Sequence, residues 1–96
     1  MHVISPKKLR DFWARHPDAE SPLRSWLRVT KRAEWQSFAD LREEFPSADQ
    51  VGRFTVFNIG GNKYRLIAGI HYNRQKVYVR HILTHPDYDK GKWKSG

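Results

Sequence analysis

The 96-residue sequence has no cysteine and no long apolar run. The lack of cysteine excludes disulfides, thiolate nucleophiles and cysteine-bound metal sites. Charged residues already occur within the first ten positions, and no apolar segment reaches the length of a signal peptide or a membrane span. We therefore expect a cytoplasmic protein that makes no membrane contact.

The sequence also lacks several common motifs of metal sites, phosphate-binding sites and acyl-transfer enzymes. The five histidines show no HExxH spacing, and the second half of the chain has no carboxylate cluster that could hold a metal. There is also no phosphate-binding P-loop and no Gly-x-Ser-x-Gly elbow for acyl transfer. We expect no metal and no other cofactor, so any catalysis would depend on side chains alone.

Acidic residues are scarce in the second half of the chain. Residues 1–50 hold nine Lys/Arg and eight Asp/Glu, whereas residues 51–96 hold nine Lys/Arg but only Asp87 and Asp89. The second half thus carries +7 of the total charge of +8. Such an imbalance indicates a polyanionic partner, because neutralising phosphates releases bound counterions. A solvated basic surface without a partner is the alternative interpretation.

The length of the chain fits one domain, residues 1–96, with a single small core. A chain of this size buries roughly two thirds of its unfolded surface, which supports a sheet and a few helices. A deep, enclosed substrate pocket is not expected at this size. We therefore expect any functional site in a surface cleft.

The first half of the chain has helical periodicity. Ser5-Pro6 and Ser21-Pro22 are each typical of a helix start, and apolar residues at helical spacing follow both. A third helical segment is expected within residues 35–45, with Ser37 as its cap. The Trp and Phe residues on these helical faces are expected in the core rather than as platforms for base stacking.

After residue 50 the pattern changes to that of strands. Three segments rich in Val, Ile, Tyr and Phe are separated by two turn sequences: 53–59, 62–72 and 75–83, with Gly60-Gly61 and Asn73-Arg74 between them. Both turn sequences suit tight hairpins, so an antiparallel meander is expected. With the β-prone residues 1–4, the fold class is α+β: a small antiparallel sheet with N-terminal helices packed on one face.

Alternation along the strands sorts the arginines onto one face. In the middle strand Leu66 marks the apolar side, and Arg65 points to the other side. In the last strand strict alternation places Val79 and His81 on the apolar side and Arg80 opposite. Arg80 is thus expected to share the face of Arg65, and His81 is expected to be a core histidine.

The end of the chain adds groups that can transfer protons. Internal transesterification of RNA needs a base for the 2′-hydroxyl, positive charge for the phosphorane and an acid for the leaving 5′-oxygen. His85 is the natural acid or base, while Arg65 and Arg80 can hold phosphate oxygens. The candidate catalytic residues are Arg65, Arg80, His85, Tyr88 and Lys90, with Asp89 as an orienting carboxylate. The candidate RNA-binding residues are Asn62, Lys63, Arg74, Lys76, Lys92 and Lys94.

The stretches FNIGGNKYRLIAGIHY and KVYVRHILTHPDYDKG resemble the HigB toxins of type II toxin–antitoxin systems, within the RelE-like superfamily of mRNA interferases. The HVIS strand, the helical region, the GGN hairpin and the THPDYD terminus follow the family order over nearly the whole chain. The resemblance implies a RelE/ParE-like fold and metal-independent cleavage of translated mRNA in the ribosomal A site. It carries over the strand arginines Arg65 and Arg80 and the terminal residues His85, Tyr88, Asp89 and Lys90.

The same resemblance implies a protein partner. HigB toxins are inhibited by HigA-type antitoxins that carry a helix-turn-helix domain, so operator DNA would be reached only indirectly, through the antitoxin complex. Two other functions remain open at this point: a non-catalytic module that binds RNA or the ribosome, and a ParE-like inhibitor of DNA gyrase. The chemistry gathered at the chain end argues against a pure inhibitor.

Overall fold

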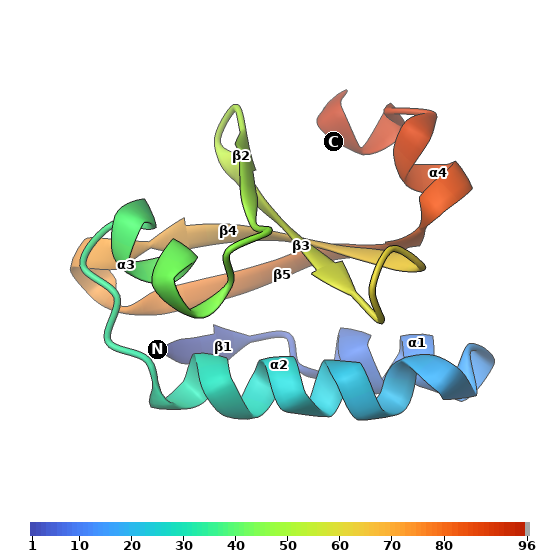
Figure 1. Cartoon of the computed structure of the whole chain (residues 1–96), viewed down its shortest axis with the longest axis horizontal. Helices are drawn as coiled ribbons and strands as arrows, with labels where there is room; N and C mark the ends of the chain where they lie inside the picture. The colour runs from blue at the N-terminus through green and yellow to red at the C-terminus, as the bar shows by residue number, and fades with distance from the viewer. Residues whose placement is uncertain (96) are drawn as a thin grey trace.

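The computed structural model describes residues 1–95 and contains a five-stranded sheet (Figure 1). The strands are β1 (His2–Ile4), β2 (Asp49–Val51), β3 (Phe54–Ile59), β4 (Tyr64–His71) and β5 (Lys76–Thr84), in the spatial order β1-β5-β4-β3-β2. Strands β2 to β5 pair antiparallel, whereas β1 joins β5 in parallel. The α+β class is confirmed, but the sheet is mixed rather than purely antiparallel. Strand β2 begins before residue 50, where the sequence pattern did not indicate a strand.

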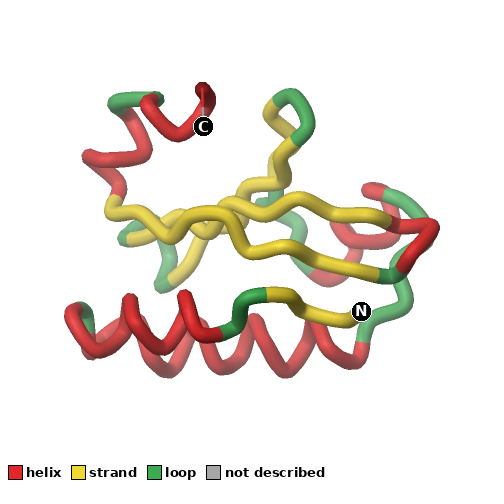
Figure 2. Tube along the Cα trace, turned by 180° about the vertical axis from the view of Figure 1, so that it is seen from behind, coloured by secondary structure: helices red, strands yellow, loops and turns green. Residues whose placement is uncertain are grey.

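Two helices lie side by side across one face of the sheet (Figure 2). They are α1 (Lys7–Arg15) and α2 (Glu20–Arg32), joined by the short 3-10 helix η1 (Pro17–Ala19). Helix α2 begins before Ser21-Pro22, which is possible because the first backbone N–H groups of a helix need no intrahelical acceptor. Helix α3 (Phe38–Glu44) is capped by Ser37, as expected, through a 3.3 Å bond from the Asp40 N–H to the serine hydroxyl.

The main core lies between these helices and the sheet face that they cover. Trp26 and Trp35 are 2% and 3% exposed, which confirms that the helical aromatic residues build the core. The Trp26 ring meets the Phe57 ring of β3 edge-on, with the ring centroids 5.4 Å apart. We call the opposite side of the sheet, which carries Phe54, Arg65 and Ile67, the open face.

The two hairpins differ from each other. Gly60 and Gly61 have φ values of 62° and 70°, so the first turn uses the left-handed conformations expected of glycine. The second connection is longer than the expected two-residue turn. It consists of the 3-10 helix η2 (Tyr72–Arg74) followed by Gln75, whose φ is 56°.

A β-bulge in β5 changes which side chains reach the open face. The pairing between β4 and β5 shifts register between Ile67 and Ala68, which leaves Arg80 as the extra residue. Beyond the bulge the alternation is reversed, so Ile82 packs against the helix-side core while His81 lines depressions on the open face. The expectation of a core histidine at position 81 is therefore wrong, because it assumed unbroken alternation.

The chain end folds back over the open face (Figure 1). Helix α4 (His85–Asp89) follows β5 directly, and the 3-10 helix η3 (Lys92–Ser95) follows α4. Trp93 is 4% exposed and forms a second small core with Phe54, Val56 and Ile67. Trp93 thus anchors the end of the chain to the open face. Among the described residues, no helix combines the length and apolar character needed to cross a membrane.

Candidate functional site

His85 and Asp89, the first and last residues of α4, form a pair. The Nδ1 atom of His85 lies 3.0 Å from Oδ2 of Asp89, one helical turn later, and both side chains are about half exposed. The His85 backbone N–H donates to the Lys63 carbonyl oxygen at 3.1 Å, which ties α4 to the hairpin between β3 and β4. An imidazole that donates its Nδ1–H to a carboxylate presents the Nε2 lone pair to a substrate. The pair thus has the form of an oriented proton acceptor.

Arg65 lies beneath α4 and is only 9% exposed. Its Nη1 donates to the carbonyl oxygens of Asn62 and Tyr64, both at 3.2 Å. Its guanidinium carbon lies 5.5 Å from the centre of the Tyr88 ring, a cation–π arrangement. Arg65 therefore stabilises the turn of the β3–β4 hairpin through hydrogen bonds and packs against the Tyr88 ring. We call Arg65, His85, Tyr88 and Asp89 the strand-end cluster.

Tyr88 uses its ring for packing within this cluster. Trp93 stacks on it with the ring centroids 5.2 Å apart and the planes 16° apart, and the Trp93 Nε1–H donates to the Tyr88 carbonyl oxygen at 3.0 Å. Arg65 also contacts the ring. Because the ring is engaged by these two residues, the hydroxyl is the part of Tyr88 best placed for chemistry.

Lys63 and Tyr64 connect the hairpin to η1. Lys63 Nζ lies 3.0 Å from one carboxylate oxygen of Asp18, and the Tyr64 hydroxyl donates to the other at 2.6 Å. The hydrogen bond from Tyr64, followed by the one from Lys63, lowers the pKa of Asp18. The Lys63 ammonium is thus directed toward η1 rather than toward His85.

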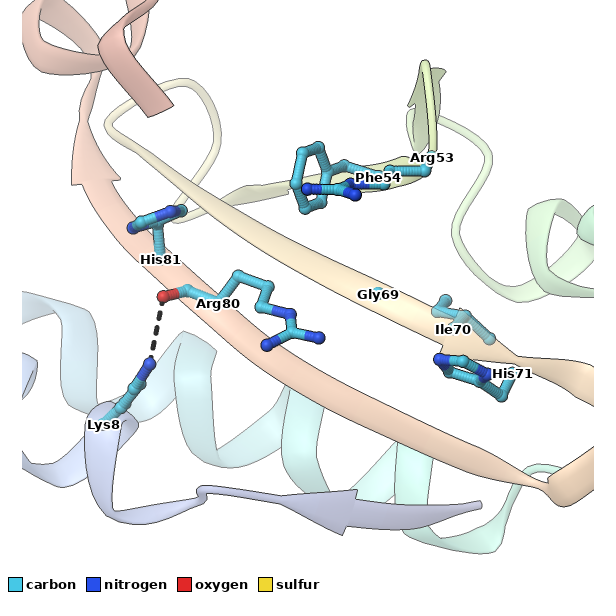
Figure 3. A pocket seen from close by; sticks show the side chains of 8 residues that line it. All are labelled: Lys8, Arg53, Phe54, Gly69, Ile70, His71, Arg80 and His81. Carbon is cyan, nitrogen blue, oxygen red and sulfur yellow. Dashed lines mark hydrogen bonds between the residues drawn. The ribbon is translucent and has the colours of Figure 1, made fainter. Parts of the chain in front are cut away.

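Arg80 lines a groove of about 700 Å³ on the open face (Figure 3). We call it the open-face groove, and its lining residues are Lys8, Arg53, Phe54, Gly69, Ile70, His71, Arg80 and His81. They come from α1, from β4 and β5, and from the first residue of β3 with the turn before it. Lys8 Nζ donates to the Arg80 carbonyl oxygen at 3.2 Å. None of these eight residues is acidic, so the groove concentrates positive charge.

Cations in and beside the groove lie over aromatic rings. The Arg80 guanidinium carbon is 5.4 Å from the centre of the Tyr78 ring, and that of Arg53 is 5.1 Å from the Phe54 ring. His71 meets the Tyr78 ring edge-on at 5.1 Å. The open face thus offers both positive charge and aromatic surface.

His81 joins the groove to α4. It also lines a neighbouring depression of about 360 Å³, here called the side pocket, together with Leu83, Asp87, Lys90, Lys92 and Trp93. Burial lowers the pKa of His81, and the positive charges of Lys8 and Arg80 lower it further. Burial and the neighbouring positive charges therefore both favour the neutral form of His81.

The site residues predicted from the sequence lie in several separate regions of the structure. Arg65, His85, Tyr88 and Asp89 meet at the strand end, Lys90 and Lys92 line the side pocket, and Arg80 lies in the groove. Arg74 and Lys76 lie at the opposite end of the β4–β5 hairpin, and Lys94 packs on the Trp93 ring.

Sequence reasoning missed four groove residues: Lys8, Arg53, His71 and His81. Arg53 belongs to the second half of the chain, whose net charge of +7 indicated a basic surface. No local sequence motif connects the four positions. Within residues 1–95, no three His, Cys, Asp or Glu side chains gather in a group that could hold a metal ion.

Comparison with known proteins identifies relatives over most of the chain. Residues 19–91 match the HigB toxin family, described as a RelE-like toxic component of a toxin–antitoxin system. The mRNA interferase toxin HigB of Escherichia coli is 32% identical over 92 residues, which cover 93% of this chain and 88% of that protein. The mRNA interferase HigB of Shigella flexneri gives the same values, and that of Escherichia coli CFT073 is 31% identical over 93 residues, or 94% and 90% of the two chains.

Proposed function

Because this chain belongs to the HigB toxin family, the RelE-like toxic components of toxin–antitoxin systems, we propose that it is an mRNA interferase: an endoribonuclease that cleaves translated mRNA. One structural observation carries the proposal. The His85–Asp89 pair stands at the end of β5, and the same strand carries Arg80 and His81 in a groove without acidic residues. A proton acceptor thus lies beside a surface suited to an RNA backbone.

The reaction we propose is internal transesterification. His85 takes the proton of the RNA 2′-hydroxyl, the 2′-oxygen bonds to phosphorus, and the bond from phosphorus to the 5′-oxygen breaks. The leaving 5′-oxygen gains a proton from a second group, for which the Tyr88 hydroxyl and the Lys90 ammonium are candidates. The products are a 2′,3′-cyclic phosphate and a 5′-hydroxyl, so all atoms and protons balance.

The two arginines contribute in different ways. Arg80 has an exposed guanidinium on β5 and holds phosphate oxygens of the RNA that leads to His85. Arg65 keeps the hairpin and Tyr88 in place, and its buried charge adds positive potential beneath the cluster. In this proposal Arg65 is therefore a positioning residue.

The proposed substrate is mRNA in the ribosomal A site, and the proposed inhibitor is a HigA-type helix-turn-helix antitoxin. The open-face groove supplies charge and aromatic surface, but it does not enclose a base, so the ribosome would present the codon to be cut. An antitoxin would neutralise the toxin by covering this basic surface or the strand-end cluster. Operator DNA would be contacted through the antitoxin.

Mapping of transcript 5′ ends after induced expression tests the proposed function. We expect new 5′-hydroxyl ends inside coding regions, and we expect them to vanish for a reporter transcript that lacks its start codon. Co-expression of the antitoxin should suppress them. Growth arrest without new ends would favour a non-catalytic module, 5′-phosphate ends would contradict the proposed chemistry, and loss of DNA supercoiling would favour a gyrase inhibitor.

A further inference from the structure

We propose that Asp18, in the helix layer on the other side of the sheet from α4, is a positioning residue for His85. Its carboxylate holds the β3–β4 hairpin, and the hairpin in turn holds the backbone of His85. The inference rests on the proposed function, because it concerns the group that takes the proton from RNA. It adds to the site the corner between α1 and α2, which supplies none of the reacting groups.

The first link joins Asp18 to two consecutive residues of the hairpin. One carboxylate oxygen accepts the Tyr64 hydroxyl at 2.6 Å, and the other lies 3.0 Å from Lys63 Nζ. Asp18 belongs to η1 and precedes these partners by 45 and 46 residues. A carboxylate with one donor on each oxygen fixes the direction of both partners. The helix corner and the hairpin are therefore joined at one point.

Tyr64 is the stronger of the two partners. Its side chain is 8% exposed, and the rings of Phe12 and His16 lie 5.2 Å and 5.5 Å from it. The hydrogen bond raises the pKa of Tyr64 and lowers that of Asp18, so the hydroxyl keeps its proton and the carboxylate its charge at neutral pH. The pair with Lys63 is exposed on both sides and adds less.

The second link joins the hairpin to the start of α4. The His85 N–H donates to the Lys63 carbonyl oxygen at 3.1 Å. Tyr64 pairs with Thr84 across the sheet, and the Thr84 hydroxyl caps α4 by accepting the Asp87 N–H at 3.3 Å. The two hairpin residues that the carboxylate contacts are thus the ones beside which α4 begins.

The position of His85 depends on these attachments because α4 is short. Its five residues are too few to form a stable helix alone. Figure 1 shows the turn between β3 and β4 lying between the helix layer and α4. Arg65 holds this turn from the open face, and Asp18 holds it from the helix side. A general base must lie about 3 Å from its proton, so movement of the turn would misplace His85.

The experiment compares variants of the corner with a matched control. Asp18→Ala removes both contacts, whereas Asp18→Asn keeps an acceptor for the Tyr64 hydroxyl. Tyr64→Phe keeps the packed ring and removes only the hydroxyl. The control is Glu20→Gln, which removes a carboxylate charge two residues away whose ion-pair partner, Arg24, lies on α2 itself. NMR relaxation gives the order parameter of each backbone amide, and cleavage of programmed ribosome–mRNA complexes gives kcat and KM.

We expect the order parameter of the His85 amide to fall from about 0.85 to below about 0.6 in Asp18→Ala, with that of Ile67 unchanged. The kcat should fall about tenfold, and KM should change less than about twofold. Tyr64→Phe should reproduce the loss of order at His85. Asp18→Asn should recover most of the order and of kcat, and Glu20→Gln should match the wild type.

Three results would overturn the inference. The first is an unchanged His85 order parameter in both Asp18→Ala and Tyr64→Phe. The second is a rise in KM at unchanged kcat, which would assign Asp18 to substrate binding. The third is an equal loss in Glu20→Gln, which would show a general effect of charge. A lower melting temperature alone does not imitate the expected result, because order parameters report the folded state.

This experiment separates the inference from the proposed function. The order parameters need neither RNA nor cleavage. If His85 loses order in the variants but the wild type creates no 5′-hydroxyl ends in cells, Asp18 still holds His85 and the endoribonuclease proposal fails. If the wild type cleaves transcripts but Asp18→Ala keeps both the order of His85 and kcat, this inference fails and the proposed function stands.

Discussion

Replacing His85 with glutamine is expected to slow RNA cleavage by about 10²–10⁴-fold, the usual contribution of a positioned proton-transfer group. Glutamine keeps hydrogen-bonding capacity next to Asp89 but cannot accept the proton of a 2′-hydroxyl. The side chain of His85 is half exposed and its structural bond to Lys63 comes from the backbone, so the fold should persist. The measurement is the single-turnover cleavage rate of a programmed ribosome–mRNA complex, with melting temperature as the check on folding.

Two further variants sharpen this test. Asp89→Asn should give an intermediate loss, because it weakens the contact that orients the His85 ring. His2→Gln serves as the matched control, since His2 is an exposed histidine on the edge strand β1. If His85→Gln cleaves at the rate of the His2 control, His85 is not the proton-transfer group.

Replacing Arg65 with alanine is expected to destabilise the protein by about 2–3 kcal/mol, because it leaves the hairpin carbonyls of Asn62 and Tyr64 without a charged donor. For a domain of this size the melting temperature should fall by roughly 10–20 °C. Arg65→Lys retains the charge but cannot reproduce the fixed guanidinium geometry, so it should recover part of the loss. Calorimetry on the three proteins measures these differences.

Arg80→Ala is the matched comparison for Arg65→Ala. The Arg80 side chain is exposed and lies over Tyr78, so its loss should change stability by less than about 0.5 kcal/mol. Its effect should instead appear as weaker RNA binding and slower cleavage at limiting enzyme. An Arg65→Ala protein as stable as wild type, or an Arg80→Ala protein that unfolds, would contradict the division of roles.

Much of the fold could be predicted because local patterns determine it. Periodic apolar residues predicted helices α1, α2 and α3, and Gly60-Gly61 predicted the turn of the β3–β4 hairpin. The parallel pairing of β1 with β5 could not be predicted, since three residues contain no signal for their partner. Strand β2 was missed because Asp49 and Gln50 are polar and exposed, and the strand is defined by backbone pairing with β3.

The candidate site shows the same distinction between local and distant contacts. The His85–Asp89 pair spans one helical turn, so the sequence alone suggested that Asp89 orients His85. The open-face groove joins Lys8 to residues 45 and more positions later, and no sequence motif connects them. The bulge that brings His81 to the groove is a shift in pairing register, which strict alternation cannot reveal.

The measurement that tests the account most directly is an NMR titration of the isotope-labelled protein with a 2′-O-methyl RNA oligonucleotide, which lacks the attacking 2′-hydroxyl and stays intact. We predict that the largest shifts of backbone amide signals occur at Arg53, at Arg80 and His81 on β5, and at His85 on α4. The amides of α2 should be unchanged, because this helix covers the other face of the sheet. Shifts centred on α2, with the amides of β5 and α4 unchanged, would contradict the claim that RNA binds across the open face and the chain end.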